Sequence, residues 1–150
     1  MAAAAFAGPA AASVLWRGDF ETGDRSQWDR SEMIGPDRLQ VVDAPMRPGR
    51  HALRAQVIKG DNPNHASGNR NELIKHDGAS EGRDLYYGWS TLWPEDYPLT
   101  PTWQVFMQWH HPGNNGAPPV RFVMGCSAND CGRPLADTLF FIVDGKNLWE

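Results

Sequence analysis

The sequence lacks any apolar run of the roughly 18 residues that a membrane-spanning helix requires. It also lacks a basic excess, because 14 lysines and arginines stand against 18 aspartates and glutamates, for a net charge of −4. A dedicated nucleic-acid surface requires clustered positive charge. We therefore expect no membrane partner and no nucleic-acid partner, although an anionic polymer can still bind in a locally basic cleft.

A helical repeat of apolar residues and an internal repeat are missing as well. Aromatic residues and turn formers are plentiful instead, with seven Trp, six Phe, 15 Gly and 12 Pro. This balance is typical of all-β proteins with sugar-stacking surfaces. With 150 residues, the chain has the length of one domain that buries its own core.

Apolar runs of strand length alternate with turn residues from Val14 onward. The expected strands are residues 39–42, 51–58, 72–74, 85–93, 103–110, 120–125 and 138–143. The segments between them are rich in Pro, Gly, Asn and Asp, which favour turns. Seven or eight short strands at this spacing predict a β-sandwich or a β-barrel.

The two ends of the chain carry separate expectations. Residues 1–13 are nearly all Ala, and they resemble either the remnant of a secretory signal or a disordered tail. Residues 14–150 are expected to form the larger, N-terminal part of one sandwich domain, because such domains commonly have about 200–250 residues. We expect the last strands of that domain beyond Glu150.

Cysteine occurs only at positions 126 and 131, close to Gly132 and Pro134. The spacing between Cys126 and Cys131 fits a small disulfide at the tip of a hairpin, and two unpaired thiols are the alternative. A disulfide, together with the signal-like start, indicates a secreted, extracellular protein.

Side chains alternate between the two faces of a strand, and residues 103–110 follow that period. One face is expected to hold Trp103, Val105, Met107 and Trp109, and the other Gln104, Phe106, Gln108 and His110. The apolar face should enter the core, and the polar face with one aromatic ring suits sugar binding. By the same period, Arg70 and Glu72 share one side of their strand.

Four short motifs carry a family resemblance. They are Gly18–Gly23 (GDFETG), Arg70–Leu73 (RNEL), Tyr86–Ser90 (YYGWS) with Trp93-Pro94, and Gln108–His110 (QWH). Over residues 15–145, the chain resembles the concanavalin-like jelly-roll polysaccharide lyases, especially the heparin-lyase-like and glucuronan-lyase-like group, with alginate lyases as more distant relatives. The resemblance implies a jelly-roll β-sandwich of two antiparallel sheets and an anionic polysaccharide substrate.

The implied reaction is β-elimination, which removes the proton beside the carboxylate of a uronic acid. That proton is weakly acidic until the carboxylate is neutralised, which Arg and amide groups can do electrostatically. A base must then take the proton, and His is suited because its ordinary pKa is about 6.5.

The resemblance assigns these roles to individual residues. Gln108 and Arg70 would neutralise the carboxylate, and His110 would be the base or a second neutralising group. Glu72 would orient Arg70. Apart from the resemblance, His65 and Asn69 in the loop before Arg70 are expected to contact the substrate, together with Gln104 and His111; the alternative for that loop is a simple connection. The side chains of Gln108, His110 and Arg70, from two different strands, are expected to converge on one open groove of the sandwich.

The acid of these families is usually a Tyr on a late strand, and no Tyr follows Tyr97 here. We expect the acid beyond Glu150, in which case the 150-residue chain is inactive by itself. The alternative is a catalytically incomplete protein.

Each motif also has a structural explanation. Arg70 and Glu72 can form a surface ion pair worth under about 1 kcal/mol. His110 and His111 can be polar residues at a strand end, and neighbouring histidines on opposite faces make a poor metal site. The tryptophans are expected to be buried in the hydrophobic core rather than to stack against sugars at the surface. No acidic cluster has calcium-ligand spacing, so the sequence supports no cofactor; a structural calcium ion, which some relatives in the resembled families hold, is the alternative.

Two other functions fit a sandwich, since fold alone does not determine function. A carbohydrate-binding module or lectin needs exposed aromatics without a proton-transfer set, and it is the main alternative. A glycoside hydrolase needs two carboxylates about 5–9.5 Å apart. The acidic residues Asp19, Glu21 and Asp24 are expected to stabilise a turn, which disfavours a hydrolase. We expect the lyase to be a monomer.

Overall fold

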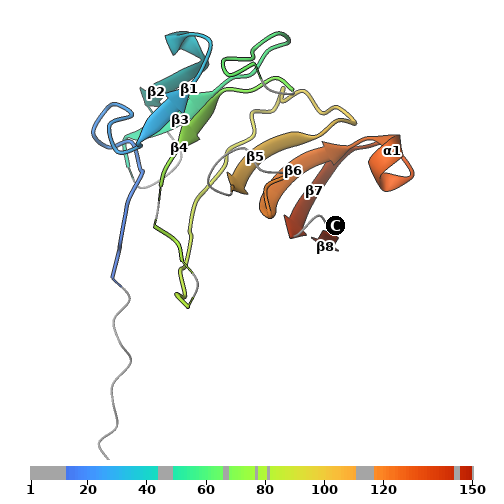
Figure 1. Ribbon diagram of the computed structural model, residues 1–150. Helices are drawn as coiled ribbons and strands as arrows, with labels where there is room; N and C mark the ends of the chain where they lie inside the picture. The colour runs from blue at the N-terminus through green and yellow to red at the C-terminus, as the bar shows by residue number, and fades with distance from the viewer. Residues whose placement is uncertain are drawn as a thin grey trace, which may run out of the picture. The chain divides into compact units, whose positions relative to one another are not determined.

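The computed structural model is all-β, and its strands pair in antiparallel sheets (Figure 1). It describes residues 13–43, 49–65, 68–76, 78–80, 82–110, 117–143 and 146–149. The chain divides into two compact units, Met1–Tyr87 and Gly88–Glu150, called here the N-terminal and C-terminal units. The predicted all-β, antiparallel fold class is confirmed. The Ala-rich start lies almost entirely outside the described residues.

The N-terminal unit contains two sheets of two strands each. Its elements are β1 (Arg30–Glu32), the 3-10 helix η1 (Pro36–Arg38), β2 (Leu39–Asp43), β3 (His51–Ala55) and β4 (Glu72–Ile74). Strand β1 pairs with β4, and β2 pairs with β3. The sequence predicted β2 and β4 closely and β3 three residues too long, and it missed β1, which has no apolar residue.

A polar cluster lies at the centre of the N-terminal unit. Asp61 and Asn71 are 4% and 7% exposed, and Asn71 Nδ2 donates to Asp61 Oδ2 over 2.7 Å. The carboxylate of Asp61 also accepts from Arg38 Nε at 2.8 Å and from the Ile58 N–H at 3.0 Å. Buried polar groups cost little free energy when they are paired in this way. The cluster therefore ties β4 to the loop that contains Asp61.

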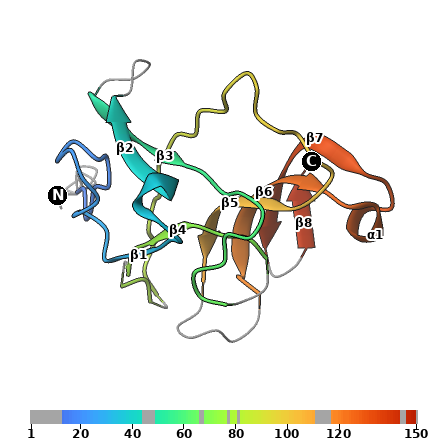
Figure 2. The same cartoon turned by 90° about the horizontal axis from the view of Figure 1, so that it is seen from above.

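The C-terminal unit has one meandering sheet in the order β5-β6-β7-β8 (Figure 2). Its elements are β5 (Gln104–Trp109), β6 (Val120–Cys126), the short helix α1 (Ala128–Cys131), β7 (Leu135–Val143) and β8 (Lys146–Trp149). Within the described ranges, neither α1 nor η1 has the length and apolar character needed to cross a membrane.

Strand β6 has apolar residues on both faces, which suits a strand with neighbours on both sides, and Arg121 is its one charged residue. On one face, Val123, Phe140 and Ile142 are nearly fully buried. On the other face, the Phe122 ring stacks on Phe141 with a centroid distance of 4.6 Å and meets Trp89 edge-on at 4.9 Å. These two clusters form the core of the C-terminal unit.

The predicted strand at residues 85–93 is wrong, because the structure gives these residues no strand. Tyr86 is 95% exposed and Leu92 is 67% exposed. A strand requires a neighbour for its backbone hydrogen bonds as well as apolar side chains, and residues 85–93 have no strand partner among the described strands. The tryptophans are also more exposed than expected, since Trp16, Trp89 and Trp103 are 40%, 43% and 42% exposed.

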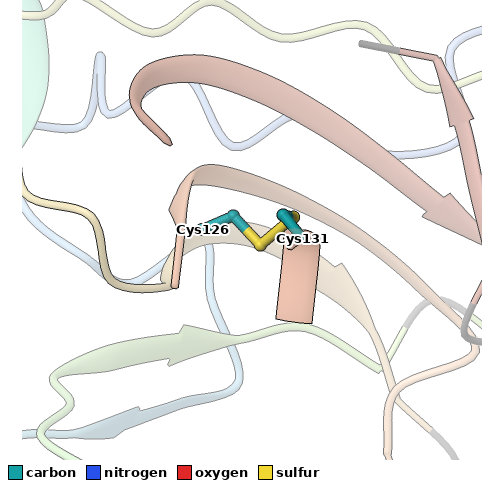
Figure 3. The surroundings of a disulfide bond; sticks show 2 residues. All are labelled: Cys126 and Cys131. Carbon is teal, nitrogen blue, oxygen red and sulfur yellow. A yellow bond between two sulfur atoms is a disulfide. The ribbon is translucent and has the colours of Figure 1, made fainter. Parts of the chain in front are cut away.

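The turn between β6 and β7 contains a disulfide between Cys126 and Cys131, which joins the end of β6 to α1 (Figure 3). The two Cα atoms are 6.2 Å apart. Just before it, Gly125 has a φ of +76°, and a Cβ atom there would be 2.5 Å from the carbonyl oxygen of Thr100. Only glycine fits this position without strain.

Candidate active site

Arg70 and Glu72 form a loose ion pair at the start of β4. The distance from Arg70 Nη1 to Glu72 Oε1 is 3.7 Å, and the two side chains are 26% and 31% exposed. Both head groups therefore keep some access to solvent. This pairing is compatible with an orienting role of Glu72 and equally with an ion pair at the surface.

Asn71, which stands between Arg70 and Glu72 in the sequence, links this ion pair to the polar cluster. Asn71 donates to the carbonyl oxygen of Gln56 at 2.9 Å and accepts from the Ile34 N–H at 3.0 Å, in addition to its bond with Asp61. The Arg70 N–H donates to the Asp61 carbonyl oxygen at 2.8 Å. The backbone of the Arg-Asn-Glu motif is thus fixed on both sides, which leaves the Arg70 side chain on a rigid support.

Burial acts to raise the pKa of Asp61, but its three hydrogen bonds and the charge of Arg38 outweigh that effect and hold the pKa below its ordinary value. Asp61 is therefore charged at neutral pH. A charged Asp61 keeps Arg38 and Asn71 in place, so it supports the Arg70 strand electrostatically.

Glu72 lies directly opposite Glu32 on β1 in the register of the sheet. Glu32 has its own partners, because Arg30 Nη2 is 2.8 Å from its Oε1 atom and Asn64 Nδ2 donates to its Oε2 atom at 2.8 Å. Like charges on opposing strand positions repel unless other groups compensate them. Arg30 and Arg70 thus each compensate one of the two carboxylates.

Two predicted substrate contacts, His65 and Asn69, lie in the loop before Arg70. His65 is exposed and has a φ of +55°, a conformation that is unusual outside glycine. Asn69 is exposed, and its Oδ1 atom accepts from the Gly60 N–H at 3.0 Å. That bond holds the loop closed, so Asn69 has at least a structural role.

A β-bulge in β5 changes the faces that alternation predicted. Val105 pairs with Val123 and Met107 pairs with Phe122, so Phe106 is an extra residue in β5. Gln104 shares a face with Met107 and Trp109, whereas Gln108 lies on the other face with Val105. The prediction that Gln104, Phe106 and Gln108 share one face is therefore wrong.

The carboxamide of Gln104 is bound to the loop before β5. Its Oε1 atom accepts from the Tyr97 hydroxyl, and its Nε2 atom donates to the Pro98 carbonyl at 3.2 Å and to the Thr100 hydroxyl at 3.1 Å. Burial raises the pKa of Tyr97, which stays a neutral donor to Gln104. Gln104 fixes this loop, and its predicted contact with substrate would have to compete with these bonds.

Gln108 is half-buried in β5, and His110 follows the end of β5 as an exposed residue. His111 lies outside the described residues. The Arg70 motif belongs to the N-terminal unit and the Gln108 motif to the C-terminal unit. Their convergence on one groove therefore stays a prediction.

Arg121 on β6 is a charged residue of the site region that the sequence motifs did not indicate. It pairs directly with Gln108 across β5 and β6, and it is only 7% exposed. A single cation within the apolar run Val120–Met124 was a signal that could have been noticed.

The acidic opening segment stabilises a turn, as expected. Asp24 accepts from Ser26 and Thr22, and Glu21 accepts from the N–H groups of Arg50 and His51. These bonds lower the pKa of both carboxyl groups, and for Glu21 the His51 N–H has the largest effect. Carboxylates that already accept hydrogen bonds from neighbouring groups of the turn are poor candidates for the acid–base pair of a hydrolase.

No group of three or more His, Cys, Asp or Glu in the described part of the chain is arranged to hold a metal ion.

The model of one protein family, described as Polysaccharide lyase, matches residues 20–140. The chain belongs to this family. No curated protein and no solved structure matches the chain. The matched residues of this polysaccharide lyase include parts of both units and all the motifs from Arg70 to His110. A jelly-roll β-sandwich is the fold of this family's domain, in agreement with the all-β chain described above.

Proposed function

We propose that this polysaccharide lyase cleaves uronic-acid-containing polysaccharides by β-elimination, and that it is related to the heparin-lyase-like and glucuronan-lyase-like group. Membership of the lyase family is the observation that carries this proposal. The Arg-Asn-Glu-Leu and Gln-Trp-His motifs support the finer assignment. The partly exposed Arg70 side chain and the half-buried Gln108 offer a cation and an amide.

In the proposed mechanism, Gln108 and Arg70 bind the uronate carboxylate and lower the pKa of the neighbouring C–H group. His110 takes that proton while a carbon–carbon double bond forms and the glycosidic carbon–oxygen bond breaks. A tyrosine is expected to give a proton to the departing oxygen. Glu72 holds Arg70 in position through their ion pair.

The full-length protein should be incubated with glucuronan, alginate and heparin while the ultraviolet absorbance of unsaturated uronate ends is followed. We expect absorbance to rise with one of these polymers. Reducing ends without absorbance would show hydrolysis and contradict the proposal.

His110→Ala should lower turnover about 100-fold or more while folding is retained, because general-base catalysis contributes that much. The control is His76→Ala, which removes an imidazole that is exposed and paired with Asp29 at 3.3 Å. It should keep wild-type turnover. Unchanged turnover in His110→Ala would exclude His110 as the base.

A non-catalytic carbohydrate-binding module is the second candidate. The exposed aromatic residue Tyr86 favours it, because aromatic faces stack on sugars. Binding of polymer by the full-length protein without either product would establish this alternative.

We also propose that the protein is secreted, since disulfides persist in oxidising compartments. The bond between Cys126 and Cys131 supports this location. Fractionation of cells that express the full-length protein tests it, and an intracellular, reduced protein would contradict it.

A further inference from the structure

Arg121 is a buried cation without an anionic partner in the part of the chain that the structure describes. Its side chain is held by two contacts: Nη1 donates to the Pro118 carbonyl oxygen at 3.2 Å, and Cζ lies 4.7 Å from the Trp103 ring centre. Because Arg121 is only 7% exposed, its charge is poorly solvated, and this burial lowers its pKa. A buried charge of this kind favours a bound anion.

Most of the hydrogen-bonding capacity of Arg121 is unused. A guanidinium group has five N–H donors, and the described residues accept from one of its nitrogens. Its Nε atom is buried and has no hydrogen-bond acceptor there. The remaining donors have the planar arrangement that matches the two oxygens of a carboxylate.

The amide of Gln108 lies beside this cation. Residues that are directly opposite in an antiparallel pair project from the same face, with Cβ atoms about 5 Å apart. Gln108 and Arg121 have this relation in the pairing of β5 with β6. The carboxamide of Gln108 is half-buried and has no hydrogen bond to another described residue. On the face of the sheet that also carries Val123, Phe140 and Ile142, a guanidinium group and an amide thus lie side by side.

We propose that Arg121 and Gln108 together form a receptor for one carboxylate group, and that in this polysaccharide lyase it is the same uronate carboxylate that Gln108 binds in the mechanism proposed above. The proposal deepens the function proposed above and rests on it. Arg121 supplies the charge and the planar donors, Gln108 supplies the amide N–H, and the Trp103 ring keeps the guanidinium plane in place. Neutral sugars and esterified uronates lack the charge that this receptor selects.

The test compares two ligands by calorimetry with the full-length protein: an oligouronate with free carboxylates and the same oligomer as its methyl ester. We expect Arg121→Met to weaken binding of the free acid about 10- to 100-fold, because hydrogen bonds to charged groups are lost. Binding of the ester should not change. The affinity of Arg121→Lys for the free acid should lie between those of the wild type and Arg121→Met, because lysine keeps the charge and loses the planar arrangement of donors.

The matched control is Arg83→Met, because Arg83 Nη1 also donates to one carbonyl oxygen, that of Gly78 at 3.3 Å, and Arg83 is exposed. It should keep wild-type affinity for both ligands. If a folded Arg121→Met protein lost affinity equally for the free acid and for the ester, or lost affinity for neither, the proposal would be overturned. Calorimetry needs no turnover, so failure of the receptor is distinguishable from failure of the lyase reaction.

Gln108→Glu keeps the proposal testable if Arg121→Met does not fold. The substitution places a carboxylate opposite Arg121, where it should form an ion pair with Arg121 and take the place of the substrate carboxylate. We expect a higher melting temperature and loss of oligouronate binding. A protein that melts no higher and still binds the oligouronate as tightly as wild type would show that no such receptor exists.

Discussion

The two units of the chain are stabilised by different interactions. In the N-terminal unit, Leu39 is the only fully buried apolar side chain among the described residues, and the paired groups of Asp61 and Asn71 occupy the interior. In the C-terminal unit, Val123, Phe140 and Ile142 form an apolar core. The first unit therefore depends on polar pairing and the second on the burial of apolar surface.

The buried polar groups of the two units also differ in how completely they are paired. Asp61 accepts three hydrogen bonds, whereas Arg121 donates one to a carbonyl and rests on an indole ring. A cluster whose buried polar groups are all paired has a structural role, and no ligand is needed to explain it. A buried cation with unused donors is better explained by a ligand, and this contrast is the basis for assigning Arg121 to binding.

Asn71→Ala should give the largest loss of stability, about 2 to 4 kcal/mol, because the buried carboxylate of Asp61 and two backbone groups lose their hydrogen bonds at once. Asn64→Ala is the control, since Asn64 is exposed and its side chain bonds Glu32. Urea unfolding of the full-length protein measures both. A loss in Asn71→Ala no greater than that of the control would mean that polar pairing does not stabilise the N-terminal unit.

Replacing Cys126 and Cys131 together by Ser should cost about 2 kcal/mol, because the disulfide closes a short loop and restricts the unfolded chain only modestly. The apolar core of the C-terminal unit should persist without it. Urea unfolding of the oxidised wild type, the reduced wild type and the double variant checks this. The latter two should agree, and a variant that is unfolded in buffer would contradict the primary role of the apolar core.

Much of the fold could be predicted from the sequence wherever a strand has a clear apolar pattern. Residues 39–42, 72–74 and 120–125 were predicted within about one residue of β2, β4 and β6. The three residues of β1 are all polar, so their pairing with β4 left no apolar signal. Residues 85–93 have the apolar pattern of a strand, but they form none because no described strand pairs with them.

The candidate site was harder to predict, because it depends on register. An extra residue in β5 moves Gln104 to the face opposite Gln108, and no local pattern in residues 103–110 reveals that bulge. The cation at position 121 was visible in the sequence. Its place opposite Gln108 follows only from the pairing of two strands, which is a non-local property.

The smallest expected effect concerns the pH dependence of the N-terminal unit. Hydrogen bonds and the charge of Arg38 hold the folded pKa of Asp61 below its ordinary value of 3.8. The unfolded state therefore binds a proton more readily, so Asp61 contributes stability above pH 3.8 that is lost as the pH falls through the folded pKa. Asp61→Asn should lower the melting temperature at neutral pH and flatten its decline in acid, so the two curves approach each other at low pH.

The control for this titration is Asp37→Asn, which removes the exposed carboxylate on the other side of Arg38. Its melting temperature should follow that of the wild type between about pH 7 and pH 3, because an exposed ion pair contributes little. Parallel curves for Asp61→Asn and wild type would show that the charge of Asp61 is not needed for the polar cluster.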